Sequence, residues 1–476
     1  MNDSIGIPKG TRDFSSMEMK KRNYLIQIIR NCFELFGFSG IETPSFEKIS
    51  TLIGKYGEEG EYLMFKLLHS GNFLSKKISD FLTKIKNKET TIDIDMIKHL
   101  TEQISNKALR YDLTVPFVRY VVMHRNEIIF PFKRYQIQPV WRADKPQKGR
   151  FREFYQCDAD IIGNSSFSLW QEIEFIQLCD EIFTKLKFPI IININHRDIL
   201  GGLVEISGIE DHLWKNFTTS LDKWNKIGRH LVKKEMLRKG ISSPSFEKIA
   251  CFFEMKENFS KKKEFLNVAF KFSKKGKKGI KDLSFIFRKI KNISLKNTKL
   301  EWNISLVRGM NYYTGTIFEI FPNHHKSNPE KKYSIGGGGR YDQLASFFGM
   351  ENISGVGVSL GLDRIYLSME KENLFQTIST FPSKVLFINF GDEEVLYAYK
   401  MINFLRKKGI STQLYPNAVK IDKQFKYAND NNIPFAISIG KNEMEKKKIR
   451  VKNIKKRIET EYDNIEDVAN QLLMII

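Results

Sequence analysis

The chain has 476 residues, 41% hydrophobic and 28% charged, an ordinary composition for a globular protein but too great a length for one core, so we expect two or three domains. Its 77 basic residues outnumber its 55 acidic ones, which favours a polyanionic partner such as a nucleic acid, although compositional drift would produce the same excess. No run of about 18 apolar residues occurs and the N-terminal residues lack an apolar signal segment, so a membrane protein is excluded and a cytoplasmic one is expected.

Cysteine and histidine spacing matches no common metal or disulfide pattern. The four cysteines lie far apart without a CxxC pair, and the eight histidines form neither HxxxH nor HExxH. The sequence therefore predicts neither a zinc ribbon nor a disulfide framework.

The N-terminal third begins with a predicted helix over residues 15–36. Its apolar face is expected to comprise Leu25, Ile28, Ile29, Cys32 and Phe36. The stretch GIETPSFEK then predicts a strand that stops near Pro44. Residues 72–107 are polar and Lys-rich, and we expect helices with loops there.

Residues 130–162 alternate like a long hairpin around the polar bend ADKPQKG. Arginines crowd this bend, and guanidinium groups bind phosphate oxygens bidentately, so Arg142 indicates a phosphate-rich ligand. For Lys145 and Lys148 we favour a solvated basic turn.

Polar side chains also alternate along the second arm of this hairpin. Gln156, Asp158 and Asp160 share one strand face, which suits an amine-bearing ligand or, equally, an exposed edge. Asp112 and Thr114 share one face of another apolar stretch, LRYDLTVPF.

Further along, residues 168–186 predict an amphipathic helix with Phe175, Leu178, Ile182 and Leu186 in register. Residues 213–299 mix helical periodicity with basic runs and read as an inserted helical module, after which strand-like text returns at 301. From 384, alternating strands and helices predict a separate, largely parallel α/β domain whose first helix turns Val395, Tyr399, Ile402 and Leu405 inward.

The stretch LVRGMNYYTGTIFEI, residues 306–320, reads as two short strands around a bend. Leu306 and Val307 lead in, Thr316 to Phe318 lead out, and Arg308, Tyr312 and Tyr313 between them need polar partners if they are half-buried.

Two glycine-rich stretches follow. In SIGGGGRYDQL glycines permit close backbone approach and Arg340 and Tyr341 are presented, whereas GVGVSLG lacks the βαβ context of a dinucleotide site.

Six stretches in order resemble the signatures of the histidyl-tRNA synthetases, a class II aminoacyl-tRNA synthetase family: IPKGTRDF; FGFSGIETPSFE as motif 1; VWRADKPQKGRFREF as motif 2; LVRGMNYYTGTIFE; GGGGRYDQL; and GVGVSLGLDRI as motif 3. The resemblance implies an α+β catalytic domain, an antiparallel sheet flanked by helices, with a helical insertion and a C-terminal α/β anticodon-binding domain. We assign residues 1–212 and 300–378 to the catalytic domain, 213–299 to the insertion and 384–476 to the anticodon-binding domain.

The same resemblance implies the roles of individual residues. Arg142 and Arg308 would be the catalytic cations, and Arg142, Phe154 and Arg364 would bind ATP, which enters as a Mg²⁺ complex. The residues implied to bind histidine are Asp112, Thr114, Gln156, Asp160, Tyr312, Tyr313 and Tyr341. Gln147 would contact the acceptor end of histidine tRNA. Motif 1 implies a homodimer, and no protein motif implies a metal site.

Two positions depart from the commoner bacterial pattern, because LRYDLT replaces LRPEGT and Asp160 replaces Glu. We interpret both as variation within the family. The main alternative is the catalytically inert, synthetase-like regulatory subunit of ATP phosphoribosyltransferase, which lacks the C-terminal domain and an intact motif 2. The RGMNYYTG stretch argues against another class II synthetase, such as a threonyl or prolyl enzyme. A non-enzymatic RNA-binding protein would fit the charge but would not need Arg308 or Arg364.

Overall fold

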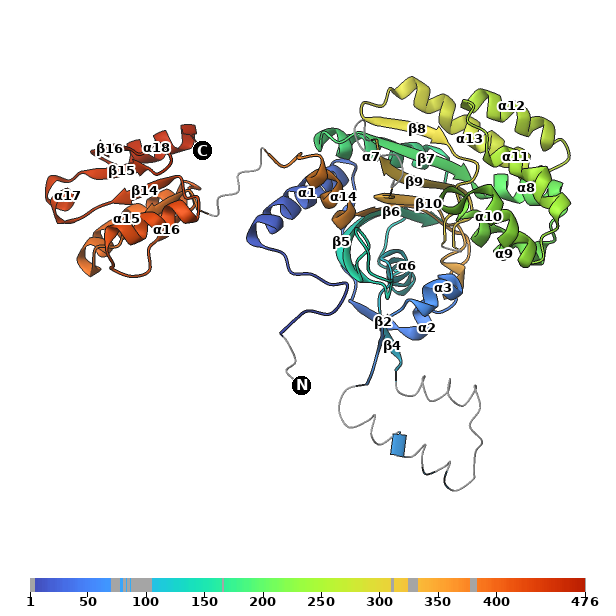
Figure 1. Cartoon of the computed structure of the whole chain (residues 1–476), viewed down its shortest axis with the longest axis horizontal. Helices are drawn as coiled ribbons and strands as arrows, with labels where there is room; N and C mark the ends of the chain where they lie inside the picture. The colour runs from blue at the N-terminus through green and yellow to red at the C-terminus, as the bar shows by residue number, and fades with distance from the viewer. Residues whose placement is uncertain are drawn as a thin grey trace. The chain divides into compact units, whose positions relative to one another are not determined.

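The computed structural model describes residues 5–69, 78–79, 83, 86, 105–164, 167–309, 312–323, 333–376 and 383–475. These residues form two compact units, of which the second consists chiefly of the residues from 383 onward (Figure 1). Most of residues 72–107, for which we predicted helices with loops, lies outside the described part. Among the described residues, no helix is both long and apolar enough to span a bilayer.

The first unit is built on an eight-stranded sheet with the strand order β1-β5-β6-β11-β10-β9-β7-β8. The strands are β1 (Ser39–Gly40), β5 (Phe132–Trp141), β6 (Glu153–Asn164), β7 (Ile190–His196), β8 (Thr298–Trp302), β9 (Thr316–Pro322), β10 (Gly336–Arg340) and β11 (Ile353–Gly361). The six central strands pair antiparallel, and the outer pairs β1/β5 and β7/β8 are parallel. The predicted antiparallel sheet with flanking helices is confirmed, with parallel pairing added at its edges.

The helices around this sheet are α1 (Ser16–Leu35), α6 (Thr114–Met123), α7 (Trp170–Lys185), α8 (Arg197–Ser207), α13 (Lys274–Ile293) and α14 (Leu362–Lys371) (Figure 1). In α7 the predicted apolar residues are all buried, as is Leu186 directly after it. In α1, Leu25, Ile29 and Cys32 are buried as expected, but Phe33 takes the place predicted for Ile28 and Phe36, which are half-buried.

The predicted strand over GIETPSFEK is divided between two sheets. β1 pairs with β5, whereas β2 (Phe46–Lys48) pairs with β4 (Lys107–Leu109) in a three-stranded sheet with β3 (Lys66–Leu67). Pro44 lies between the two parts and lacks the N–H that a continuous ladder would need. Two short helices, α2 (Ile49–Leu52) and α3 (Gly57–Tyr62), follow β2.

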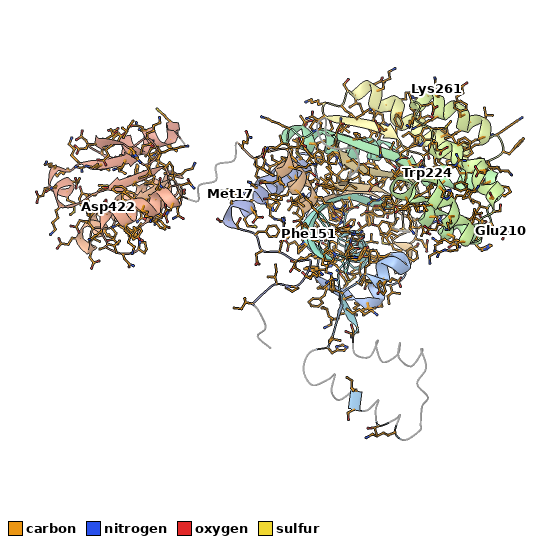
Figure 2. The ribbon with its side chains drawn as sticks, in the orientation of Figure 1. Met17, Phe151, Glu210, Trp224, Lys261 and Asp422 are labelled. Atoms are coloured by element: carbon orange, nitrogen blue, oxygen red, sulfur yellow. The ribbon has the colours of Figure 1, made fainter. Side chains whose placement is uncertain are left out.

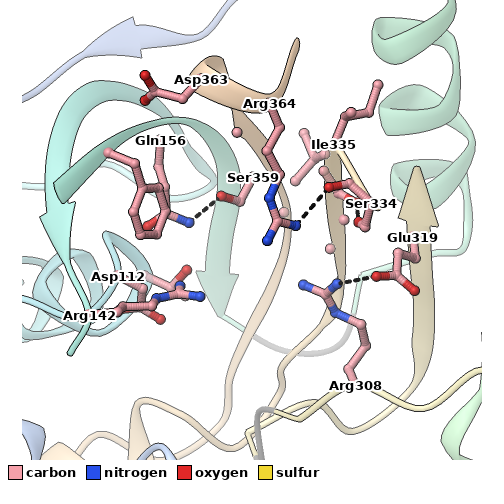
Figure 3. Close-up of a pocket in the computed structure, with 18 of the residues that line it drawn as sticks. Asp112, Arg142, Gln156, Arg308, Glu319, Ser334, Ile335, Ser359, Asp363 and Arg364 are labelled. Atoms are coloured by element: carbon pink, nitrogen blue, oxygen red, sulfur yellow. Dashed lines mark hydrogen bonds and ion pairs between the residues drawn. The ribbon is translucent and has the colours of Figure 1, made fainter. Parts of the chain in front are cut away.

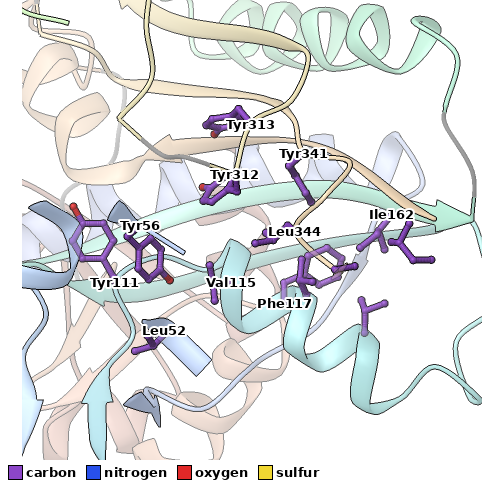
Figure 4. Packing of buried hydrophobic residues seen from close by; sticks show 14 of the residues in the cluster. Leu52, Tyr56, Tyr111, Val115, Phe117, Ile162, Tyr312, Tyr313, Tyr341 and Leu344 are labelled. Atoms are coloured by element: carbon purple, nitrogen blue, oxygen red, sulfur yellow. The ribbon is translucent and has the colours of Figure 1, made fainter. Parts of the chain in front are cut away.

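A core cluster fills the space between the large sheet, α2 and α6. Figure 4 shows its aliphatic side chains, such as Leu52 and Val115, together with five tyrosines, residues 56, 111, 312, 313 and 341. Because a buried phenol needs a hydrogen-bond partner, we expect polar groups beside these tyrosines. Figure 2 shows the described side chains on the ribbon in the same orientation as Figure 1.

The first of the two short strands predicted around the RGMNYYTG stretch, at Leu306 and Val307, is not formed. Both residues are buried. The side-chain amide of Asn195 on β7 donates to the carbonyls of Ile304 (2.9 Å) and Leu306 (3.0 Å), so a side chain supplies the bonds that a neighbouring strand would supply.

Residues 211–293 are helical, as predicted for the insertion. They form η1 (Asp211–Leu213), α9 (Trp214–Leu221), α10 (Trp224–Arg238), α11 (Ser243–Phe253), α12 (Phe259–Ala269) and α13. Phe217, Trp224, Phe246 and Phe253 pack as an aromatic cluster inside the module. The strand after it begins at Thr298, three residues before the predicted return at 301.

The second unit contains a five-stranded sheet in the order β13-β12-β14-β15-β16. Its elements are β12 (Val385–Phe387), α15 (Asp392–Lys407), β13 (Thr412–Leu414), α16 (Ile421–Asp430), β14 (Phe435–Ser438), α17 (Lys441–Lys446), β15 (Ile449–Asn453), β16 (Ile458–Tyr462) and α18 (Ile465–Ile475). The first three strands are parallel, as predicted, but β15 and β16 form an unforeseen antiparallel hairpin.

This hairpin places acidic residues opposite part of a Lys- and Arg-rich segment, residues 440–457. Arg450 and Lys452 lie opposite Glu461 and Glu459, and Lys448 is paired with Asp463. Acidic residues that follow in the sequence thus neutralise part of the run. In α15, Ile402 and Leu405 are buried as expected, but Tyr399 is 44% exposed, and Ala398 takes the inward position.

Candidate active site

A cavity of about 200 Å³ opens above the middle of the large sheet. Its walls come from β6, β10 and β11, the 142–152 loop, the segment around Arg308 and the starts of α6 and α14. The predicted site residues that line it are Asp112, Thr114, Arg142, Phe154, Gln156, Asp160, Arg308, Tyr312, Tyr313, Tyr341 and Arg364. Residues up to 252 positions apart in sequence are thereby brought to one place; Gln147 alone among the predicted set does not line it.

The floor of the cavity requires glycine. A Cβ on Gly338 would lie 2.0 Å from the carbonyl oxygen of Gly357, and one on Gly357 would lie 1.9 Å from Oδ1 of Asp160. A Cβ on Gly337 would meet Nη1 of Arg308 at 2.6 Å. The close backbone approach expected from both glycine-rich stretches therefore occurs under the site.

Three arginines, Arg142, Arg308 and Arg364, line the cavity (Figure 3). Arg364 donates to the carbonyls of Gly149 (2.9 Å) and Ser334 (2.8 Å). Burial, together with repulsion from Arg142 and Arg150, lowers the pKa of Arg364. Such a cluster of guanidinium groups suits a ligand with several negative charges.

The other two arginines also have partners within the protein. Arg142 donates from Nε to the carbonyl of Tyr111 (3.0 Å), and its guanidinium carbon lies 4.3 Å from the Tyr111 ring centre and 5.2 Å from that of Phe154. Nη1 of Arg308 lies 3.7 Å from the carboxylate of Glu319.

Buried carboxylates and phenols also line the cavity. Asp112 accepts from Tyr56 Oη (2.8 Å), from Tyr312 Oη (3.3 Å) and from the Val115 backbone N–H (3.1 Å). Burial raises the pKa of Asp112. The predicted pair Asp112 and Thr114 thus lies at the N-terminal end of α6, and its partner Tyr56 had no recognisable signal in the sequence.

Asp160 is held between two neighbours. Tyr341 donates to its Oδ1 at 2.6 Å, and Nη2 of Arg134 lies 2.8 Å from its Oδ2. Arg134 is fully buried, 4.1 Å above the ring centre of Phe117, and was missed by sequence reasoning. A signal existed, because Arg134, Gln136 and Gln138 form the polar face of β5 directly opposite Asp160, Asp158 and Gln156 of β6.

The alternating face of β6 is buried, so the exposed-edge interpretation of Gln156, Asp158 and Asp160 is wrong. Gln156 and Asp160 line the cavity and Asp158 lies between them on the same face. Nε2 of Gln156 donates to Oγ of Ser359 at 2.6 Å (Figure 3).

Arg340 does not serve the cavity, contrary to the impression from GGGGRYDQL. Its guanidinium makes two 2.8 Å hydrogen bonds to the carboxylate of Glu172 on α7, and both residues are buried. This bidentate pair ties β10 to α7.

Gln147, Lys145 and Lys148 are exposed on the loop between β5 and β6. The N-terminal segment braces this loop, because the Arg152 N–H donates to the carbonyl of Gly10 (2.8 Å). Arg150 is paired with Asp144 at 2.8 Å. Within the described ranges, no group of three or more His, Cys, Asp or Glu side chains is arranged to hold a metal ion.

The ordered motifs form a largely antiparallel sheet and a cavity lined by arginines, buried acids and phenols. This combination defines the catalytic domain of a class II aminoacyl-tRNA synthetase. Residues 78–365 match the family model described as "Histidyl-tRNA synthetase", and residues 384–473 match one described as "Anticodon binding domain". The chain belongs to the histidyl-tRNA synthetase family.

Individual relatives agree. The chain is 52% identical to a histidine--tRNA ligase of Christiangramia forsetii, with 96% of each chain covered, and 50% identical to one of Flavobacterium johnsoniae, with 95% of this chain and 96% of the relative covered. The crystal structure of histidyl-tRNA synthetase from a Nostoc species superposes with a TM-score of 0.78 at 26% identity, covering 99% of this chain and all of the other. The regulatory-subunit alternative is less supported, since these curated relatives are ligases.

Proposed function

We propose that the chain joins L-histidine to histidine tRNA in two steps at the cavity above the sheet. The carboxylate of histidine attacks the α-phosphate of ATP and pyrophosphate leaves. A hydroxyl of the terminal ribose of the tRNA then attacks the carbonyl carbon of the adenylate, and AMP leaves. The observation that carries this proposal is one cavity lined both by three arginines and by buried acids and phenols.

At the ATP end, Arg142 would bind the α-phosphate, Arg364 the γ-phosphate and Phe154 the adenine. Arg308 would face both the histidine carboxylate and the α-phosphate. The transition state accumulates negative charge there, and preorganised cations in a water-poor site stabilise such charge strongly. The backbone bonds that fix Arg142 and Arg364 support this assignment.

At the amino-acid end, Asp160 and Tyr313 would bond the two imidazole nitrogens, with Tyr312 and Tyr341 shaping the pocket. Asp112, Thr114 and Gln156 would hold the α-ammonium group. The hydrogen bonds of Tyr341 to Asp160 and of Tyr312 to Asp112 support a preorganised pocket. A pocket that bonds its substrate in this way rejects analogues lacking the groups by roughly 10⁴–10⁵.

ATP would enter with Mg²⁺, which usually binds one or two protein carboxylates together with phosphate oxygens. The carboxylate of Glu319 lines the cavity beside Arg308 and fits such a role. Bound Mg²⁺ would neutralise phosphate charge during the displacement of pyrophosphate.

Recognition of tRNA would involve both units. Gln147 is exposed on its loop and offers an amide that can read a base edge, whereas Lys145 and Lys148 would meet phosphates. Residues 384–476 would bind the anticodon. Residues 213–299 would form an insertion in the catalytic domain, which comprises residues 1–212 and 300–378. The helix and strand of motif 1 would form the interface of a homodimer, and the protein would act in the cytoplasm.

The test is pyrophosphate exchange into ATP with each of the twenty amino acids, followed by charging of histidine tRNA. We expect exchange with histidine alone and charging only of histidine tRNA. Exchange with another amino acid would reassign the pocket, and no exchange with any would favour a regulatory role.

A further inference from the structure

Asp158 is a buried acid that the proposed reaction does not use. It is 1% exposed and lies on the cavity-facing side of β6 between Gln156 and Asp160. It does not line the cavity, because its neighbours cover it. Burying a carboxyl group is costly without a compensating role, so its contacts need an explanation.

The strand register identifies those neighbours. In antiparallel pairs, residues directly opposite each other project from the same face, and Asp158 lies opposite Gln136 on β5 and Ser359 on β11. A side-chain hydrogen bond from Ser359 is among the effects that oppose the rise in the pKa of Asp158. Ser359 also accepts the 2.6 Å hydrogen bond from Nε2 of Gln156.

A serine hydroxyl has a single proton, and this determines the direction of the chain of hydrogen bonds. If Ser359 donates its proton to Asp158, it can only accept from Gln156, and the Gln156 amide must turn its nitrogen toward Ser359. The amide oxygen, Oε1, then faces away from Ser359, and it is buried without a partner. Gln156 lines the cavity, so a bound ammonium group would supply the donor that this oxygen lacks.

A protonated, neutral Asp158 is consistent with this series of hydrogen bonds. Burial, and secondarily the neighbouring Asp160, raises the pKa of Asp158 to about 8, against an opposing effect of Arg134. A neutral Asp158 can accept from Ser359 through its carbonyl oxygen while its own O–H serves Oε1 of Gln136, which has no other partner. The negative charge on this face then rests on Asp160, which Arg134 neutralises.

We propose that Asp158 is a positioning residue that acts through Ser359 to hold the Gln156 amide with its oxygen toward the α-ammonium group of the bound amino acid. This inference rests on the proposed function, because it assumes that Gln156 meets that group. It adds to it a reason for two polar residues, Asp158 and Ser359, to which the motifs assign no role. Without these hydrogen bonds, the Gln156 amide could turn and point its two N–H donors at the ammonium group.

The experiment measures histidine-dependent pyrophosphate exchange in the full-length chain with the substitutions Ser359→Ala and Asp158→Ala. Each should raise the KM for histidine about tenfold, because a hydrogen bond to a charged group is misdirected. The KM for ATP should change less than about twofold, and the double variant should be no worse than either single one, since both act through the same bonds.

Conservative and distant substitutions provide the controls. Asp158→Asn keeps a carbonyl for Ser359 and a donor for Gln136, and Ser359→Thr keeps the hydroxyl, so both should stay within about threefold of the wild-type KM. Asp180→Asn alters another buried acid, which accepts the backbone N–H groups of Lys296 and Asn297 far from the cavity, and should leave the histidine KM unchanged.

Two competitive inhibitors separate positioning from a general loss of structure. Histidinol keeps the ammonium group and should bind Ser359→Ala about tenfold more weakly, whereas imidazolepropionate lacks that group and should bind it as well as the wild type. Equal losses for both inhibitors, or unchanged histidine KM in both alanine variants, would overturn the inference. If wild-type exchange did not depend on histidine, the proposed function itself would fail first.

Discussion

Arg134 and Asp160 lie directly opposite each other on β5 and β6, and Nη2 of the arginine is 2.8 Å from Oδ2 of the aspartate. The arginine is completely buried and the aspartate is 3% exposed. Removal of one partner from a buried ion pair leaves the other charge uncompensated, which typically costs about 3–5 kcal/mol.

Arg134→Leu should therefore lower the stability of the catalytic unit by about 3–5 kcal/mol and raise the KM for histidine more than that for ATP. Urea unfolding and exchange kinetics measure the two effects. Arg229→Leu is the control: Arg229 pairs with Glu247 on the insertion surface, where its side chain is 42% exposed, and this variant should lose less than about 1 kcal/mol. An unchanged histidine KM in Arg134→Leu would mean that the charge of Asp160 does not matter for binding.

Arg308→Ala should abolish most adenylate formation while the fold persists. A preorganised group that faces developing negative charge contributes about 3–4 kcal/mol to the transition state, by analogy with oxyanion donors. Pyrophosphate exchange measures the effect, and the thermal unfolding midpoint checks the fold. Near wild-type exchange would remove Arg308 from the catalytic set.

The buried Asp158 should make stability depend on pH. Its pKa is raised from 3.8 to about 8, so between these values the folded chain binds this proton more tightly than the unfolded chain. Its contribution to stability is then complete below about pH 4 and is lost as the pH rises toward about 8. Asp158→Asn cannot titrate, so its melting temperature relative to the wild type should increase from pH 5.5 to about pH 8.5. A constant difference would show that Asp158 ionises normally.

Gln147→Ala should lower tRNA charging and leave histidyl-adenylate formation unchanged, because the side chain is exposed on the loop and outside the cavity. Aminoacylation and exchange are measured on the same preparation. If both reactions fell together, the loop would serve the architecture of the site and not the tRNA.

A chain that ends at residue 380 should still exchange pyrophosphate with histidine and lose most charging. The cavity residues all precede residue 365, and the second unit has its own buried core around Phe387, Ile402 and Ile437. Binding of tRNA by the intact chain should also weaken steeply with salt, since phosphate contacts release counterions. Loss of exchange on truncation would show that the catalytic fold depends on the second unit.

Much of the architecture follows from local patterns. Period-two alternation in residues 130–162 predicts the hairpin of β5 and β6, and the 3.6-residue apolar period predicts α7, because each pattern reflects one buried face of one element. The ordered motifs likewise predict the cavity residues from Asp112 to Arg364. These features depend on residues close together in the chain.

Other features depended on which distant segments meet. Tyr56 reaches Asp112, Arg340 turns to Glu172 and the acids of β16 neutralise the bases of β15 only because packing brings these segments together. Leu306 and Val307 look like a strand, yet they form none, and the Asn195 side chain donates to the carbonyl of Leu306 instead. Sequence alone determined the family, the elements and the chemical groups of the site; the tertiary structure decided their partners, because register and burial are set across the sheet and not along the chain.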